Sequence, residues 1–523
     1  MSLRDTLRFC LVEAALMQSA LPSAFGESHL VLNPADTAVI AAVGQYTITV
    51  KEFREGYEFG PSFIQHSADP KADYLQYLIN EKLIALDGFA HGLDTMDSVR
   101  RILRELEDDI AVTEWYRREI VPLVHIDSLR VQEGVEEKSV TLTYRSISSD
   151  DEISLRDIKS QLDRGMLFDS LFASLKEAPA FAVKEVSGDF FTIHESNAQI
   201  ADTLARMKPG SCSEIIRTGS GFSLVRLDRT RKDLITTITA YESMRAKVER
   251  YFAEHILDSI TVSYTRSLME KCPPTISGES LNTIVGLLLN PAGQSPTEGQ
   301  EEIGMKDLVR PEVVLPDNPG GRALVTSTCD AFTIRDFTVW YSYRHFKIAG
   351  SRRTATTVWT IKEMIFRMVR DKRLIRIARA KGYGEDPNVQ SEMNQWKSKL
   401  SYWKQKSAAI SPPVLTDEAV HSFYSENKRR YERDAKGAEV AYEQAKGKVA
   451  NDLLLFEYNK QLFRYIQSLK EKYPVTVNES VLKSIHVADE GLSKKIDVVI
   501  LKRGGTLPRR AFPSIDKEWQ FFQ

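Results

Sequence analysis

The sequence Ala240-Tyr241-Glu242 … Lys247-Val248 … Ser267-Leu268-Met269-Glu270-Lys271 occurs twice in this chain, and the repetition decides how the fold is organised. Its second occurrence reads Ala441-Tyr442-Glu443 … Lys448-Val449 … Ser468-Leu469-Lys470-Glu471-Lys472, at a constant offset of 201 residues. The proline and threonine that follow, Pro273 and Thr275, return as Pro474 and Thr476 at the same offset. The stretch is therefore a tail that two halves of the chain share.

A shorter head sequence is repeated as well. Ile48-Thr49-Val50-Lys51-Glu52-Phe53 returns as Phe332-Thr333-Ile334-Arg335-Asp336-Phe337. The interval from Phe53 to Lys271 in the first half is much longer than the matching interval from Phe337 to Lys472 in the second. The first half thus holds roughly 80 additional residues between its head and its tail, which is the size of a small domain.

Composition sets the class of protein. A chain of 523 residues is too long for a single core, since cores stop growing at roughly 250–300 residues. An apolar content of 42% and a charged content of 27% are typical of a globular protein. Because 70 basic residues nearly balance 72 acidic ones, no strong field would attract nucleic acid. We expect no nucleic-acid partner.

Cysteine and histidine spacing argues against a metal site. The four cysteines, Cys10, Cys212, Cys272 and Cys329, form no Cys-x-x-Cys pair, and so few cysteines argue against a scaffold built on disulfides. His194, His255 and His345 have no partners at the spacing of metal ligands. We expect no metal and no cofactor.

The N-terminus is typical of a secretory signal peptide. Arg4 and Arg8 precede the mostly apolar stretch 9–24, which small residues follow, so residues 1–26 predict export to the periplasm. The alternative is a short amphipathic helix of the mature protein. No other segment approaches the roughly 18 apolar residues needed to span a bilayer, so we expect no integral membrane segment.

Local signals predict a mainly helical frame around these repeats. Thr49 with Glu52, and Thr333 with Asp336, are capping boxes that predict helices beginning near 50 and 334. Helical spacing over 74–91 and 361–381 ends at Gly92 and Gly382, and further helices are expected at 98–119, 389–406, 239–271 and within 417–472. Residues 277–321, rich in proline and glycine, are interpreted as an irregular connector. The end of the chain has a strand-like Val498-Val499-Ile500-Leu501 and an apolar close at 519–522 that should dock within the chain or on a partner.

The extra residues of the first half change character. From about 139 to 231 the pattern predicts a strand at 140–144, a helix at 154–165, a short strand at 181–183, a short helix at 200–207, and two strands around the glycine turn 219–221. Three places in this insert resemble parvulin-type peptidyl-prolyl isomerases: Gly188-Asp189, the turn Lys208-Pro209-Gly210-Ser211-Cys212-Ser213, and the thread from Gly221 to Arg231. The surrounding frame resembles the periplasmic chaperone SurA and its relatives over most of residues 37–275.

The resemblance implies an α+β fold, mainly α, in which a duplicated SurA-like helical frame carries one inserted parvulin-like α/β domain. The implied organisation, from the N-terminus onward, is a signal peptide (1–26), a first helical chaperone domain (37–135), the parvulin-like domain (138–232), a returning helix (235–275), the connector (277–321), a second helical chaperone domain (322–410), its returning helices (413–478) and a C-terminal tail (479–523).

The insert departs from the family at the residues that matter for catalysis. Active parvulins carry one histidine in the first strand and one in the last, and these places are held here by Tyr144 and Ser223. Residues expected to line the proline pocket are Tyr144, Ile200, Met207, Phe222 and Ser223. Prolyl isomerisation crosses a barrier of ~18–20 kcal/mol without breaking a bond, so an apolar pocket that favours the twisted amide is needed rather than a nucleophile. Loss of both histidines predicts weak or absent isomerase activity.

Three functions remain open. The first is an envelope folding factor that binds unfolded or extended polypeptides, outer-membrane proteins among them. The second is an active parvulin-type isomerase whose histidines have been replaced without loss of function. The third is a structural subunit of an envelope assembly that docks through its apolar C-terminus.

Overall fold

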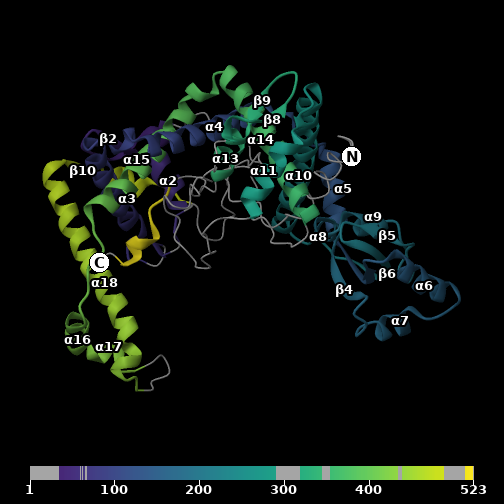
Figure 1. Ribbon diagram of the computed structural model, residues 1–523. Helices are drawn as coiled ribbons and strands as arrows, with labels where there is room; N and C mark the ends of the chain where they lie inside the picture. The colour runs from purple at the N-terminus through teal and green to yellow at the C-terminus, as the bar shows by residue number, and fades with distance from the viewer. Residues whose placement is uncertain are drawn as a thin grey trace. The chain divides into compact units, whose positions relative to one another are not determined.

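The computed structural model describes residues 34–58, 60–61, 63–64, 67–289, 319–343, 354–433, 439–487 and 513–521. The predicted signal peptide and the predicted strand at Val498–Leu501 lie outside these residues. The fold is α+β and mainly α, with three small sheets, which confirms the predicted class (Figure 1). The described residues form two compact units, one of residues 116–271 and one of the residues before 116 and after 271.

The first head begins with the hairpin β1 (Val39–Val43) and β2 (Tyr46–Thr49), followed by the helices α2 (Val50–Glu58), α3 (Pro70–Ala90) and α4 (Asp97–Glu119). Helix α2 begins at Val50 as expected, and the Glu52 amide donates to the Thr49 hydroxyl over 3.2 Å. Gly92, at φ 68°, ends the α3 turn in the left-handed conformation that glycine adopts without strain.

The second head repeats this order. The hairpin β8 (Ala323–Thr326) and β9 (Ala331–Thr333) precedes α13 (Ile334–Ser342), α14 (Thr354–Ala380) and α15 (Pro387–Ala409). The capping box is complete, since the Thr333 hydroxyl accepts from the Asp336 amide and the Asp336 carboxylate accepts from the Thr333 amide. Gly382 ends α14 at φ 80°, as predicted.

The tails are long helices, each followed by a strand and a short helix. The first comprises α10 (Ile238–Lys271), β7 (Thr275–Ile276) and α11 (Gly278–Leu289), and the second comprises α18 (Tyr442–Lys472), β10 (Val475–Val477) and α19 (Glu479–Ser484). The interpretation of 277–321 as irregular is therefore wrong at its start, where the apolar run 284–289 lies in α11. Before α18, the chain forms α16 (Asp417–Glu426) and α17 (Lys428–Tyr431), which pack on the first part of α18 (Figure 1).

Each small sheet of the larger unit joins the head of one half to the tail of the other. The sheet orders are β10-β1-β2 and β7-β8-β9. Ala41 pairs with Val477 and Ala42 with Thr476, while Val325 pairs with Ile276 and Thr326 with Thr275. Ala41 of the first head corresponds to Val325 of the second, and Val477 of the second tail corresponds to Ile276 of the first. With these correspondences, the two sheets have the same pairing register. The recurrence holds for these two sheets, while duplication of the whole frame stays a prediction.

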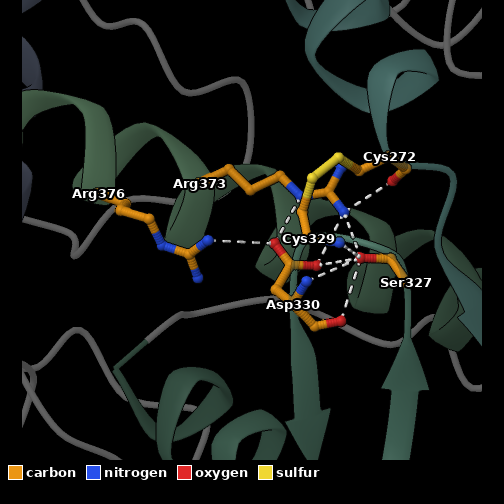
Figure 2. Close-up of a disulfide and its surroundings, with 6 residues drawn as sticks. All are labelled: Cys272, Ser327, Cys329, Asp330, Arg373 and Arg376. Carbon is orange, nitrogen blue, oxygen red and sulfur yellow. Dashed lines mark hydrogen bonds and ion pairs between the residues drawn. A yellow bond between two sulfur atoms is a disulfide. The ribbon is translucent and has the colours of Figure 1, made fainter.

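A disulfide that was not predicted from the sequence reinforces one of these sheets. Cys272 follows α10, Cys329 lies in the turn between β8 and β9, and their Cα atoms are 5.8 Å apart. Beside them the buried Arg373 donates to the Cys272 carbonyl over 2.8 Å and to both carboxylate oxygens of Asp330 over 2.9 Å (Figure 2). The exposed Arg376 lies 3.7 Å from the same carboxylate. Tail and head are thus joined by a covalent bond and an ion pair.

The apolar end of the chain docks within the chain. Residues 513–521, which include the 3-10 helix η8 (Lys517–Phe521), pack into the core that α3, α15 and α18 share. Ile515 and Trp519 are fully buried there. Of the two outcomes predicted for this segment, the intramolecular one is confirmed.

Candidate peptide-binding site

The insert folds as a lobe around a four-stranded antiparallel sheet. Its strands are β3 (Val140–Ser149), β4 (Ala182–Asp189), β5 (Ile216–Thr218) and β6 (Gly221–Lys232), in the order β4-β3-β6-β5. The helices α6 (Glu152–Asp163) and α7 (Phe168–Ser174) pack on one face, and α8 (Phe190–Ser196) and α9 (Ala198–Leu204) on the other. The chain enters through α5 (Ser128–Lys138) and leaves through α10, which pack against each other. Helices α7 and α8 were not predicted from the sequence.

The motif residues of the insert occupy positions that suit their chemistry. Asp189 ends β4 and caps α8, accepting from the amides of Phe191 and Thr192. Gly210 adopts φ 87° and Gly221 adopts φ 127°. A Cβ atom at Gly221 would lie 2.7 Å from the Ser149 carbonyl oxygen, so a larger residue would push the β5–β6 turn away from β3.

The structure brings three of the five predicted pocket residues together. Tyr144 and Ile200 are each 6% exposed and share one apolar cluster with Val225 and Leu227 on the α8–α9 face. Met207 is half-buried against the same cluster. Burial raises the pKa of the Tyr144 phenol, so this side chain stays neutral over the physiological range. These three residues belong to the apolar core between the sheet and α8–α9.

The other two predicted residues separate, since neighbouring residues of a strand point to opposite faces. Phe222 packs on the α6–α7 face, against the cluster that contains Ile147 and Leu224. Ser223 is buried on the α8–α9 face. Phe222 is therefore not brought to the same side of the sheet as Tyr144.

Tyr144 and Ser223 share a face but are not neighbours. Tyr144 pairs with Leu227, whereas Ser223 pairs with Ser148. Four residues separate the two rungs, about 13 Å along a strand at roughly 3.3 Å per residue. The hydroxyl oxygens of Ser148 and Ser223 lie 2.7 Å apart in a hydrogen bond. The residue opposite the second predicted histidine position is thus Ser148, which sequence reasoning missed.

This arrangement has a definite chemical capacity. Two hydroxyls that bond to each other stay neutral, and serine becomes a nucleophile only when a base activates it. Tyr144, Ile200 and Ser223 are buried, so on this face they contribute to the packing of the lobe.

A hollow lies on the α6–α7 side of the lobe. It has a volume of about 360 Å³, and its lining comprises Lys159, Leu162, Asp163, Met166, Leu167, Phe168, Asp169, Gly210, Cys212 and Arg226. Leu167 is 70% exposed at its rim, while Arg145 and Arg226 hold Asp169 at 2.7 and 3.1 Å. None of the five predicted residues lines it. The only sequence signal for it is the apolar Met166-Leu167-Phe168 directly after Gly165, where a loop would ordinarily be polar.

No protein-family model matches the sequence, and no curated protein matches it. Solved structures similar to this chain include two isomerases and a chaperone. The chain is similar to peptidylprolyl isomerases and SurA-like chaperones. The peptidylprolyl isomerase PrsA of Bacillus anthracis is 15% identical, with 36% of this chain and 96% of that chain covered and a TM-score of 0.20.

Two further matches are of the same strength. A chain from the structures of PEB4 and Cj1289, SurA-like chaperones of Campylobacter jejuni, is 17% identical over 45% of this chain and 98% of that one, with a TM-score of 0.20. PrsA of Bacillus cereus is 15% identical over 47% and 95%, with a TM-score of 0.22. Likeness at this level does not carry a function across, so the residues of this chain must carry it.

Proposed function

We propose that this protein is a folding factor of the cell envelope that binds unfolded or extended polypeptides, outer-membrane proteins among them. The observation that carries the proposal is the lobe. Its order β3-α6-α7-β4-α8-α9-β5-β6 places the three motifs that resemble parvulins at a helix cap and at two left-handed glycine turns. Such a lobe offers its two turns, and the hollow beside α7, to an extended chain.

Weak or absent isomerase activity is part of this proposal. The Ser148–Ser223 hydroxyl pair occupies the rung where the resemblance implies a histidine, and Tyr144 lies about 13 Å further along. Neither group carries charge at neutral pH. The alternative is an active isomerase that works without histidines. It would have the same fold, so only a measurement of the isomerisation rate distinguishes the two.

Export to the periplasm is also a proposal, and the disulfide supports it. Disulfides persist in oxidising compartments and are rare in the cytosol, where thiols are kept reduced. Cys272 of this pair is buried beside Arg373, while Cys329 is exposed. Among the described residues, no helix combines the length and apolar character that crossing a bilayer requires.

The chaperone role is tested by aggregation of an unfolded client. We expect the purified mature chain to suppress light scattering of a denatured outer-membrane protein at a two- to fivefold molar excess. An unrelated protein of equal size and charge serves as the control. Scattering that is unchanged at tenfold excess would contradict the proposal.

The isomerase alternative is tested with a protease-coupled proline-peptide assay. We expect the wild-type rate to lie within a factor of two of the uncatalysed rate. A clear catalytic rate that Ser223→Trp abolishes, while Glu185→Trp on the exposed strand β4 leaves it intact, would instead establish an active isomerase. The matched control adds the same indole to the same sheet away from the hydroxyl pair.

A further inference from the structure

Residues 513–521 lie in a surface built by elements from distant parts of the larger unit. The buried Ser514 hydroxyl donates to the Gly56 carbonyl of α2 over 3.0 Å. Asn459 of α18 donates to the Phe521 carbonyl. Between these two ends, Asp516 and Trp519 reach into α3 and α15. The segment thus crosses four helices through a few anchor contacts.

Trp519 is the apolar anchor of the segment. It is 2% exposed, its ring stacks on Tyr77 of α3 with centroids 5.5 Å apart, and its indole nitrogen donates to Glu81 over 2.9 Å. The Asp516 amide donates to the same Glu81 oxygen over 2.9 Å. A fully buried tryptophan with its N–H paired is the residue type that most often dominates a binding interface.

Asp516 is the charged anchor. Its carboxylate accepts from the Tyr402 hydroxyl at 2.9 Å, the Trp403 indole at 3.0 Å and the Lys406 ammonium at 3.2 Å, and it lies 2.9 Å from the Lys399 ammonium. Burial alone would raise the pKa of this carboxyl, but the two lysines outweigh burial and hold the pKa well below its usual range. Asp516 is therefore ionised in its site.

The lysines beneath the segment match an acidic occupant in charge. Lys399 is paired with Glu81 of α3 at 2.6 Å. Among the described residues, the carboxylates that contact Lys406 are Asp516 and Glu518, and both belong to the segment. Without the segment, Lys406 would lose both of these carboxylate partners.

We infer that this surface is a peptide-binding groove, which selects a carboxylate followed three residues later by a tryptophan, and that residues 514–519 are its built-in occupant. The partner that fits is an extended polypeptide carrying the same Asp-x-x-Trp spacing, which displaces the chain's own segment. The groove comprises Tyr77, Glu81, Lys399, Tyr402, Trp403 and Lys406. This inference stands apart from the folding-factor proposal, since it rests only on contacts within the larger unit.

The test keeps the full chain and frees the occupant after folding. A site-specific protease sequence is placed within 488–512, the protein is purified intact and then cut, and a fluorescent peptide of residues 511–523 is added. We expect fluorescence anisotropy to show micromolar binding to the cut chain and at least tenfold weaker binding to the uncut chain, because a tethered segment competes at an effective concentration near millimolar. Circular dichroism of the cut chain verifies that the frame stays folded.

Peptide variants decide whether the anchors are those named above. Asp516→Ala and Trp519→Ala in the peptide should each weaken binding at least thirtyfold, whereas Lys517→Ala, at an exposed position, should change it less than twofold. Equal binding to cut and uncut chains, or no exchange into the cut chain over days, would overturn the inference and leave a fixed structural latch.

A charge-matched pair of variants provides a second readout. In the cut chain, Lys406→Met should weaken binding of the wild-type peptide at least tenfold. The Asp516→Asn peptide should recover most of that lost affinity for the same variant. Lys404→Met on the same helix serves as the control and should leave both affinities unchanged. Failure of the recovery would show that Lys406 does not read the carboxylate.

Discussion

Two junctions between tail and head share one strand register and differ in the side chains that reinforce it. In the disulfide junction (β7, β8, β9, Cys272, Arg373), a covalent bond and a buried ion pair hold the tail. In the aromatic junction (β10, β1, β2, Tyr473, Leu86), Tyr473 takes the place that Cys272 has in the repeated tail. There the Gly44 amide donates to the Pro474 carbonyl over 2.8 Å. Pairing of the strands thus requires neither cysteine nor arginine.

The difference separates what the fold needs from what each junction adds. Both tails supply a short strand after a proline, and both heads supply a hairpin with an irregularity at the same place, between Val39 and Ala41 and between Ala323 and Val325. The side chains around that pairing differ: one junction has a disulfide, and the other has a tyrosine in the same place. Substitutions in one junction alone therefore measure how much its own side chains add to the free energy of unfolding.

The largest effect should come from Arg373→Met. The Asp330 side chain, 2% exposed, would then be a buried charge without its main partner, which typically costs about 3–5 kcal/mol of the free energy of unfolding. Denaturant unfolding measures it. Arg376→Met is the control, because Arg376 is 59% exposed and 3.7 Å from the same carboxylate, and its loss should cost under about 1 kcal/mol. Equal effects of the two substitutions would contradict the assigned roles.

Cys329→Ser should be next in size. The disulfide closes a loop with a sequence separation of 57, and removing such a bridge costs about 2–4 kcal/mol. A reductant should lower the unfolding midpoint of the wild type to that of the variant and leave the variant unchanged. A wild type that is indifferent to reductant would show that the bridge does not form.

Asp330→Asn tests how the stabilisation from the Asp330 charge in the disulfide junction depends on pH. Hydrogen bonds from Arg373 hold the pKa of Asp330 below its ordinary value of 3.8, so its stabilisation is complete above that value and is lost as the pH falls through the lower folded value. We expect a loss of about 2 kcal/mol at pH 7, measured by denaturant unfolding, and a gap to the wild type that narrows below pH 3.8.

The aromatic junction should respond to acid in the same direction. Burial tends to raise the pKa of Asp87, but hydrogen bonds from Lys472 and Tyr465 lower it overall. Asp87→Asn is therefore the matched variant for Asp330→Asn. A gap to the wild type that stays constant from pH 7 to pH 3 in either variant would exclude that carboxylate as an acid-sensitive contact.

The smallest effect should come from Gly44→Ala. Gly44 has φ +57°, and an added Cβ would lie 3.2 Å from a Leu86 methyl, so we expect a loss of about 1–2 kcal/mol by thermal or denaturant unfolding. Gly447→Ala in α18 is the control. Its Cβ would meet open space, and alanine in a helix should gain up to about 1 kcal/mol.

Local signals in the sequence predicted helix ends well and long-range pairing poorly. Thr49, Thr333, Gly92 and Gly382 act within a few residues of themselves, so their helix starts and stops could be predicted. The partner of Cys272 could not, because no spacing pattern links it to Cys329. Nor could the exchange of tails, since Thr275-Ile276 and Thr476-Val477 are equally suited to either head.

The sequence predicted residues of the candidate site but not the register in which β3 and β6 pair there. Motif spacing identified Tyr144 and Ser223, and their burial on one face follows from strand alternation. An irregularity between Thr143 and Tyr144 shifts the pairing with β6. Ser148 therefore lies opposite Ser223, and a motif comparison carries no information about such a shift.

The exchange of tails also sets an order for synthesis. When the ribosome has made β9, the strand β7 already exists, so the sheet of the second head can close at once. The hairpin of β1 and β2, made far earlier, must keep the edge of β1 open until β10 emerges near residue 475. The sheet of the first head is thus the first to begin forming and the last to be completed. Any product truncated before that point exposes an unpaired strand edge, which is a template for aggregation and a mark that a protease can recognise.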